Sequence, residues 1–417
     1  MSKRNTRVVS AALAGAVAMT LVSCTSTVSG VAVIGSQSTD ADGAVVALLD
    51  TGKYPTTAGH PVGTAGSQAT GAVLEAQRMA EYVVGPWQVN AHPTQLRQTN
   101  FLATQAAPDI HLLKDALPQP VPDIASAHGV ITAFITSRTS SNPQVPLMLT
   151  NLVMRFPDPA AASAAATEMA AATSRLPDPP RSPIAIHNQP EALASAHDEL
   201  GDQTAINSFA AHGAYVLYQS AKSKKEEFAD LASQAEELVE GALRIQENLI
   251  DQFAATDPAK LADLPLDPTG KLLARTLPTS DSTAALVVGV WQPRAWLHFE
   301  EDPIAAAASY AADGVEVIAE GLTTVYQTSN AGGAARMVQR FTTRLGPSVK
   351  AISGVPGLPA AKCLARQGMA PAPTLHEMTA RYSCIASADQ YAFIAYSDTE
   401  KDVKQQISAQ YRILAGK

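Results

Sequence analysis

The sequence is poor in cysteine, in aromatic residues and in charge. Of 417 residues only three are cysteines, 5% are aromatic and 16% are charged, whereas 46% are hydrophobic. No Cys-x-x-Cys spacing occurs, which speaks against a cysteine-based metal or redox site. The net charge of −8 comes without a block of lysine and arginine, so nucleic acid and anionic membrane surfaces are poor candidate partners. The hydrophobic content argues against general disorder.

Several motifs of catalysis are missing as well. No Gly-x-Ser-x-Gly, His-Glu-x-x-His or Gly-rich phosphate loop is present. Asp50-Thr51-Gly52 resembles the loop of aspartic proteases, but that chemistry needs two carboxylates and would require a symmetric dimer here, so we interpret it as a turn. In His298–Pro303 we prefer a capped helix start over a calcium site. The sequence therefore predicts no catalytic, cofactor-binding or metal-binding residues.

The N-terminus has the pattern of an export signal. Lys3, Arg4 and Arg7 precede an apolar run over residues 8–22, which is short for a membrane-spanning helix. The following Leu-Val-Ser-Cys resembles a bacterial lipobox, in which the thiol of Cys24 would receive diacylglycerol. The alternative is an ordinary signal peptide with an incidental cysteine. We predict a lipoprotein signal peptide over residues 1–23.

An anchor of this kind would determine where the protein works. Residues 24–43 are small and polar and are expected to form a flexible tether. Two or more acyl chains would hold the body at the outer face of the cell membrane. The predicted partners are thus the membrane, through the N-terminal lipid, and an envelope protein, a glycan or a lipid ligand.

A pattern of elements occurs twice in the remaining chain. Each copy reads as a strand, a helix, a hairpin and a second helix. The first copy has its strand at 149–156, an alanine-rich helix that starts at Asp158-Pro159, its hairpin at 203–221 and its second helix at 223–253. The second copy has the same elements at 322–328, 331–345, 380–397 and 399–414. Asp158-Pro159 has the pattern of a helix start, and Gly346-Pro347 that of a helix end. We predict an α+β fold of two related strand–helix–hairpin–helix modules, with antiparallel sheets packed with helices. The alternative is that the same order of elements recurs by chance, because this order is common in α+β domains.

Further elements are expected around the two copies. The sequence predicts strands at 44–49, 284–291, 295–299 and 315–318, a helix within 71–84, and a helix that starts at Asp302-Pro303 and ends at Gly314. Residues 255–282 are rich in proline and aspartate, which suggests a domain boundary there. We therefore predict an N-terminal domain over 44–255, a linker over 256–282 and a C-terminal domain over 283–417.

The long helix of the first copy carries an apolar seam. Its members step by three and four positions: Phe228, Leu231, Ala235, Leu238, Ala242, Ile245 and Leu249. Such a seam can cover the helix's own sheet or form a coiled-coil contact with a partner. We favour packing on the sheet, because alanine stands at two of the positions.

Two cysteines and three tryptophans complete the set of candidate residues. In an exported protein Cys363 and Cys384 are expected to form a disulfide, which would close a loop of 21 residues and contribute about 3 kcal/mol. We place Cys384 in a strand and Cys363 in a gap rich in proline and glycine. Trp87, Trp291 and Trp296 close a core or line a ligand cleft.

The stretches VVALLDTGKYPTTAGHPVG, EAQRMAEYVVGPWQV and WQPRAWLHFEEDP, with the lipobox and the late cysteines, resemble an actinobacterial lipoprotein family found chiefly in mycobacteria and nocardiae. The last module also resembles the sensor-type extracellular domains of that group. The resemblance implies location and architecture and brings no catalytic residues. We expect a non-catalytic binding or scaffolding protein; the alternatives are an extracytoplasmic hydrolase, or a lipid carrier with a large apolar cavity.

Overall fold

A computed structural model describes residues 43–96, 105–107, 109–225, 233–279, 287–343, 349–367 and 380–416. All of them belong to one compact unit that runs from Thr39 to Lys417. The predicted signal peptide and tether, with Cys24, lie outside the described residues. Within the described part, none of the helices combines the length and the apolar character that crossing a bilayer requires.

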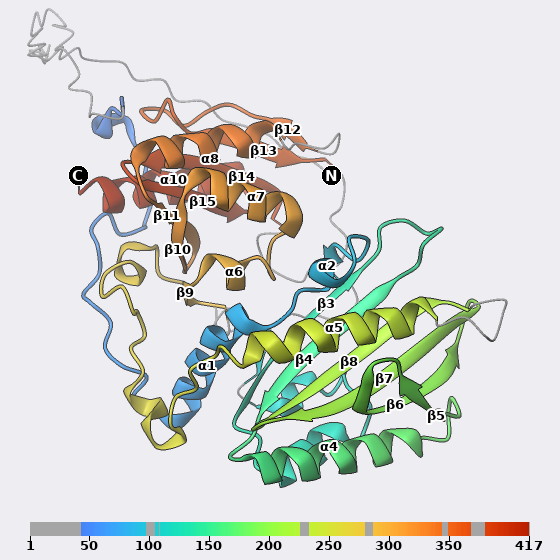
Figure 1. Cartoon of the computed structure of the whole chain (residues 1–417). Helices are drawn as coiled ribbons and strands as arrows, with labels where there is room; N and C mark the ends of the chain where they lie inside the picture. The colour runs from blue at the N-terminus through green and yellow to red at the C-terminus, as the bar shows by residue number, and fades with distance from the viewer. Residues whose placement is uncertain are drawn as a thin grey trace, which may run out of the picture. The chain divides into compact units, whose positions relative to one another are not determined.

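The N-terminal module is an antiparallel sheet covered by helices on both faces (Figure 1). Its sheet order is β1-β3-β4-β8-β7-β6-β5, and β2 also pairs with β3. The strands are β1 (Gln95–Leu96), β2 (Gln105–Ala107), β3 (Thr132–Thr139), β4 (Met148–Arg155), β5 (Ser182–Ile186), β6 (Gln189–Glu199), β7 (Gln203–His212) and β8 (Tyr215–Lys224). The helices of the module are α1 (Gln68–Met79), α2 (Pro86–Val89), α3 (Val121–Ala127), α4 (Pro159–Ser174) and α5 (Gln234–Ile250), with short 3₁₀ turns η2 (Ala80–Tyr82) and η3 (Ile110–Leu113).

The C-terminal module is built in the same way. Its antiparallel sheet has the order β12-β13-β14-β15-β11-β10-β9. The strands are β9 (Gly289–Trp291), β10 (Val315–Glu320), β11 (Thr323–Thr328), β12 (Val349–Ala351), β13 (Lys362–Arg366), β14 (Tyr382–Ala388) and β15 (Tyr391–Ser397). The helices are α6 (Pro293–Trp296), α7 (Pro303–Asp313), α8 (Ala331–Thr343) and α10 (Glu400–Ala415).

The two modules share one topology. The order β3-β4-β8-β7-β6-β5 of the first sheet corresponds to β10-β11-β15-β14-β13-β12 of the second. The helices correspond as well. Helix α3 precedes the six strands of the first module as α7 precedes those of the second, and α4 follows the second of these strands as α8 does. Helix α5 follows the last strand of the first module as α10 follows that of the second. The predicted α+β fold of two related modules with antiparallel sheets is therefore confirmed.

Both modules contribute to one shared core, but they do so with faces of their sheets that are not equivalent in the common topology. In the first sheet, α4 covers a separate core, while the α5 face supplies residues such as Phe134 and Val153 to the shared one. In the second sheet the α8 face, with Ile318 and Ile394, joins the shared core, and α10 covers the other face. One continuous apolar cluster therefore holds both modules.

The first described residues pack on the C-terminal module. Residues 46–48 form a 3₁₀ turn, η1 (Val46–Leu48), so the predicted strand at 44–49 is wrong. Val45 donates to the carbonyl of Gly357 at 2.7 Å, and the hydroxyl of Tyr54 donates to Asp402 at 2.8 Å. The prediction assigned residues from 44 onward to the N-terminal domain, whereas the start of this stretch contacts the C-terminal module.

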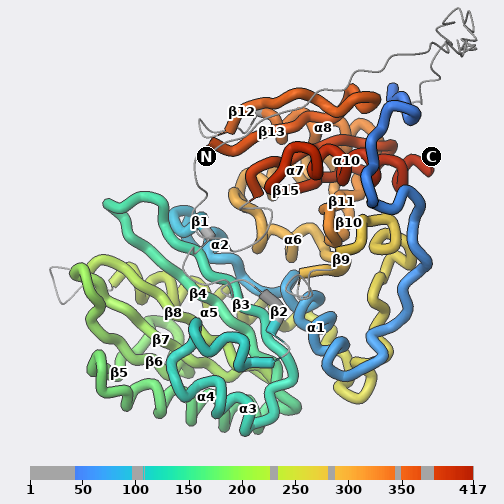
Figure 2. Tube along the Cα trace, turned by 180° about the vertical axis from the view of Figure 1, so that it is seen from behind, coloured from blue at the N-terminus to red at the C-terminus, as the bar shows by residue number. Residues whose placement is uncertain are grey.

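A connecting segment, residues 251–279, leads from α5 to the C-terminal module. It holds two 3₁₀ turns, η4 (Pro258–Asp263) and η5 (Leu273–Arg275), and buries three leucines, Leu261, Leu272 and Leu277. Residues 50–67 run beside it (Figure 2), with the amide of Gly59 donating to Ala274 at 2.8 Å and Thr64 bridging Pro265. The segment predicted as a linker is thus partly buried and hydrogen bonded.

Two predicted elements differ from the structure. Residues 295–299, expected as a strand, start inside helix α6 and continue as turns, because Pro293 occupies a first helical position. The helix expected from residue 223 begins at Gln234, since Ser223 still belongs to β8; Phe228 and Leu231 of the seam lie outside the described residues. Its remaining seam packs on β8, β7 and β4, which confirms packing on its own sheet.

Candidate functional site

A pocket of about 280 Å³ lies where helix α1, the connecting segment and strand β9 meet. Most of its lining is apolar, and four polar side chains interrupt it. The lining residues are Leu74, Gln77, Arg78, Glu81, Tyr82, Phe253, Ala254, Leu264, Pro265, Leu266, Pro268, Val290 and Gln292. Both modules and the segment between them therefore contribute to one cavity, which is a common location for ligand sites.

Helix α1 supplies one wall because it is held close to the connecting segment. Its N-terminus is capped by Ser67, whose hydroxyl accepts the amide of Thr70 at 3.1 Å. Gly71 permits the close contact with η4: a Cβ at this position would lie 2.2 Å from the carbonyl oxygen of Leu261. The next turns of the helix then place Leu74 and Gln77 toward the cavity.

Charged groups at one edge of the pocket form an ion-pair group of one carboxylate and two guanidinium groups. Glu75 is fully buried, and its carboxylate accepts from Arg78 at 2.5 Å and from Arg155 at 2.6 Å. The amide of Thr256 donates to the same carboxylate at 2.8 Å. The Arg78 guanidinium also lies 5.4 Å from the centre of the Phe253 ring. The Arg78 charge is thus paired with the Glu75 carboxylate within the protein.

Glu81 differs from this ion-pair group. It belongs to η2, is half-buried and lines the pocket. Burial raises the pKa of its carboxyl, and the attraction of Arg294 offsets that effect only in part. Among the described residues, neither a hydrogen bond nor an ion pair to this carboxylate is present. The group therefore lines the cavity without a protein partner among the described residues.

Buried polar side chains fix the backbone that carries Glu81. The imidazole of His298 donates to the carbonyl of Ala80 at 3.1 Å, and Gln246 donates to that of Tyr82 at 2.7 Å. Gln246 also accepts the amide of Val84 at 2.9 Å, and Asn151 donates to the Val84 carbonyl at 3.1 Å. This stretch of the pocket wall is held from strand β4, helix α5 and the C-terminal module.

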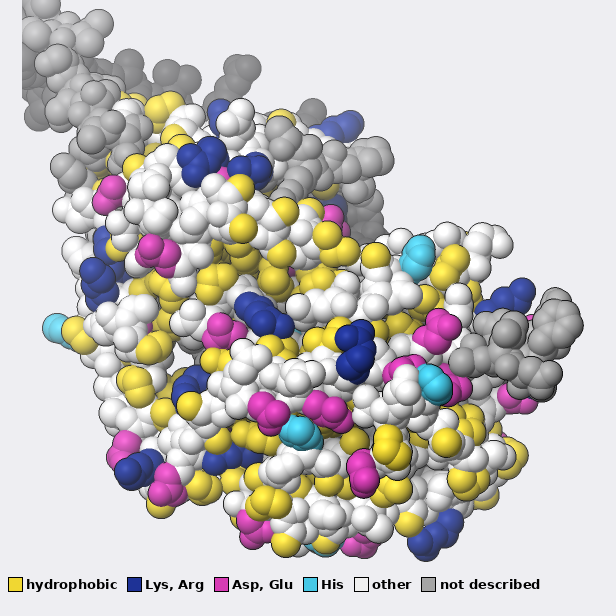
Figure 3. Space-filling model, viewed as in Figure 1, with side chains coloured by type: hydrophobic (Ala, Val, Ile, Leu, Met, Phe, Trp, Pro, Cys, Tyr) yellow, Lys and Arg dark blue, Asp and Glu magenta, His cyan; other side chains and the backbone are white. Residues whose placement is uncertain are grey.

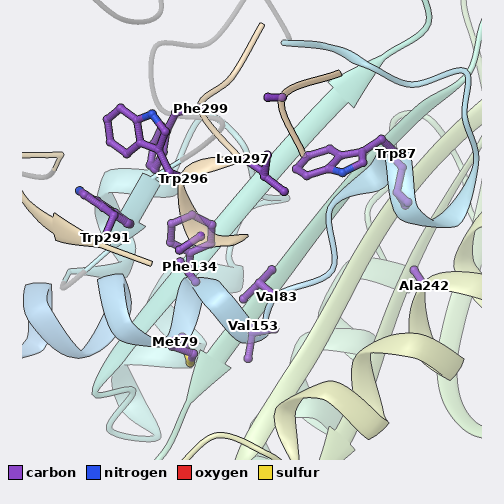
Figure 4. Packing of buried hydrophobic residues seen from close by; sticks show 14 of the residues in the cluster. Met79, Val83, Trp87, Phe134, Val153, Ala242, Trp291, Trp296, Leu297 and Phe299 are labelled. Carbon is purple, nitrogen blue, oxygen red and sulfur yellow. The ribbon is translucent and has the colours of Figure 1, made fainter. Parts of the chain in front are cut away.

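The three tryptophans belong to the core next to the pocket. Trp291 and Trp296 pack with Phe299, at ring distances of 5.0 and 5.1 Å, and Phe134 of the first sheet lies 6.3 Å from Phe299 (Figure 4). Trp87 stacks with the guanidinium of Arg138 at 5.0 Å. None of the three lines the described pocket, so the core interpretation holds for that site.

The other residues singled out in the sequence have structural surroundings. Cys363 and Cys384 form a disulfide and lie directly opposite each other in β13 and β14, so the placement of Cys363 in an irregular gap is wrong. Asp50 accepts the amide of Gly52 at 2.9 Å, as a turn requires. Asp302 caps α7 through the amide of Ala305 at 2.9 Å. Within the described residues no cluster of three histidine, cysteine or carboxylate side chains suits a metal ion.

Sequence reasoning missed the residues of the pocket. The sequence places Glu81 and Phe253 within predicted helices, because each stands in an apolar helical pattern. The available signal was weak: a single carboxylate inside the run AEYVV, followed far along the chain by a proline-rich stretch. Only the fold shows that the two stretches meet.

Charges of both signs are mixed on one face of the molecule. On the face shown in Figure 3, lysine and arginine side chains alternate with aspartate and glutamate over both modules. A ligand approaching this face would meet no extended field of one sign. Recognition would then depend on local groups such as those of the pocket.

Fold and pocket together define a two-module α+β protein with a small cavity at the junction of its repeats. The chain belongs to the DUF7373 family. The N-terminal model, described as "Domain of unknown function (DUF7373) N-terminal", matches residues 62–266, and the C-terminal model of the same family matches residues 272–417. The first match ends and the second begins inside the connecting segment.

Comparison with individual proteins adds little to the family match. No curated protein matches the chain. Among solved structures, the extracellular domain of PknH from Mycobacterium tuberculosis is similar over 42% of this chain and 97% of its own, with 11% identity and a TM-score of 0.29. At these values the likeness supports no argument about function.

Proposed function

We propose that this protein is an extracytoplasmic, lipid-anchored binding protein whose pocket takes a small and mostly apolar ligand. The observation that carries the proposal is the cavity between α1, the connecting segment and β9, with its apolar walls and few polar groups. Such cavities at module junctions are typical small-molecule sites. Its volume of about 280 Å³ favours a small ligand over the bulky lipid of a carrier.

Two features support the location. The disulfide between Cys363 and Cys384 is of the kind that persists in oxidising compartments. The N-terminal leader and lipobox provide a means of export and attachment. The finer claim, acylation of Cys24, is tested by the intact mass of the protein from its host membrane. We expect a diacylglyceryl adduct that is lost in Cys24→Ala; an unmodified thiol in the native protein would contradict it.

Ligand binding in the pocket can be tested with a substitution that fills the cavity. Val290 lines the cavity and is half-buried, so Val290→Trp should occupy the space of a ligand. Native mass spectrometry of the protein purified from its host envelope should show a bound small molecule in the wild type and none in Val290→Trp. Leu48→Trp is the control, because Leu48 is 47% exposed and outside the pocket. Equal retention of the molecule by all three proteins would contradict the proposed site.

A further inference from the structure

The charged groups of the pocket differ in how far other protein groups already bind them. This difference indicates the chemistry of a ligand. Two charged side chains line the cavity, Arg78 and Glu81. The guanidinium of Arg78 is bound by Glu75 at 2.5 Å, by the hydroxyl of Thr256 at 2.5 Å and by the carbonyl of Ala254 at 3.1 Å. These bonds engage three of its five N–H groups, and the Glu75 carboxylate pairs with its charge, so it binds a further anion less readily than an unpaired guanidinium would. Glu81 has no such partner among the described residues.

A carboxylate on a largely apolar wall favours a cation over other polar groups. Charge-assisted hydrogen bonds are about twice as strong as neutral ones, and water competes weakly in a partly desolvated site. An anionic ligand would instead place like charges next to each other. Arg294 of α6 attracts Glu81, but it forms no ion pair with it within 4.0 Å in the described residues and does not line the cavity.

The rest of the cavity would hold an apolar chain. Leu74 and Phe253, each 8% exposed, and the proline and leucine side chains of residues 264–268 form this part of the lining. Tyr82 packs against Phe253 with ring centres 5.3 Å apart, so the aromatic wall is fixed before a ligand enters. A fixed apolar wall beside one unpaired carboxylate is complementary to an amphiphile with a positive end.

We propose that the ligand is a small amine whose ammonium group pairs with Glu81 and whose apolar body lies against Leu74 and Phe253. This inference rests on the proposed function, because it specifies the ligand class for the same pocket. Binding is non-covalent, and the protein transfers no group to the amine.

The test compares three probes of equal chain length: octylamine, octanol and octanoate. Their affinities for the full mature chain are measured by isothermal titration calorimetry at neutral pH, with wild type, Glu81→Gln and Glu191→Gln. Glu191 is an exposed carboxylate of β6 and serves as the matched control. We expect wild type to bind octylamine about tenfold or more tightly than octanoate. Glu81→Gln should lose that preference and keep its affinity for octanol, and Glu191→Gln should behave as wild type.

The outcomes separate this inference from the proposed function. Octanol binding with no preference for the amine, or a preference that persists in Glu81→Gln, overturns the ammonium assignment and leaves an apolar pocket. Tighter binding of octanoate overturns it as well. If none of the three probes binds, and native mass spectrometry shows no ligand, the proposed function fails together with the inference.

Discussion

Among the described residues, buried polar side chains connect the two modules of this protein. Arg138 of β3 has no exposed surface and donates to the carbonyls of Thr94, His298 and Glu300 at 2.6, 2.7 and 2.8 Å. Burial lowers the pKa of its guanidinium to about 9, so the group stays charged at neutral pH. A cation placed at the end of helix α6 satisfies carbonyls that would otherwise lack donors.

His298 gives a prediction about pH. Its imidazole is buried, and burial, with the nearby Arg138, lowers its pKa from 6.5 to about 3. Below pH 6.5 the unfolded state therefore binds a proton that the folded state does not, and stability falls by about 1.4 kcal/mol per pH unit. Between pH 7.5 and 5.0 the wild type should lose about 2 kcal/mol more than His298→Gln, measured by urea unfolding.

The control for this experiment is another histidine. His60 is exposed, so His60→Gln should follow the wild type across the same pH range. Parallel curves for wild type and His298→Gln would show that His298 does not remain neutral inside the folded protein.

Residues that act locally could be predicted from the sequence, and residues that act across the fold could not. Asp158 and Asp302 cap helices through amides three positions away, and both were identified from the Asp-Pro pattern. Arg138 contacts carbonyls about 160 positions away, and Glu81 faces residues of the connecting segment. No local pattern marks such residues, because their partners are brought to them by the packing of two modules.

Among the elements, helices with caps and long periodic stretches were predicted well, whereas short apolar stretches were not. Residues 44–49 and 295–299 have the composition of strands, yet they form a 3₁₀ turn and the end of helix α6. An apolar stretch of five or six residues suits either conformation, and packing decides between them. The late start of α5 has a similar cause, since Ser223 and Lys224 complete the pairing of β8 with β7.

The contact between α1 and η4 can be tested with one methyl group. Gly71→Ala would place its Cβ 2.2 Å from the carbonyl oxygen of Leu261, so helix and turn must separate. We expect a loss of about 1–3 kcal/mol in the free energy of unfolding, reduced by the higher helix propensity of alanine. Chemical denaturation measures it.

Gly332→Ala in α8 is the matched control for this substitution. The nearest atoms to its Cβ would be side-chain atoms of Asn330 and Arg336 at 3.1 and 3.4 Å. The end of the Arg336 side chain can move, and the Asn330 oxygen, which accepts the amide of Gly333 at 3.0 Å, needs to shift only slightly, so this variant should lose much less stability than Gly71→Ala. Equal stability of Gly71→Ala and Gly332→Ala would mean that α1 and η4 are less closely packed than described.

At the scale of the whole molecule, the shared core predicts cooperative unfolding. Trp87, Trp291 and Trp296 all belong to the cluster that joins the modules, so tryptophan fluorescence reports on their junction. Far-ultraviolet circular dichroism reports on helices and strands throughout the chain. The two signals should change at the same denaturant concentration. A fluorescence transition that clearly precedes the loss of secondary structure would show that the modules separate before they unfold.

The docking of residues 44–54 has a consequence for the order of synthesis. Their partners, Gly357 and Asp402, lie about 300 to 350 positions later in the chain. A ribosome makes this stretch early, yet the surface that it packs against exists only after strands β13 to β15 and helix α10 have been made. Residues 44–54 can therefore reach their final position only after the C-terminal elements have been made and have folded. A chain cut short before α10 would leave the early stretch uncovered and open to proteases, so incomplete copies would be degraded faster than complete ones.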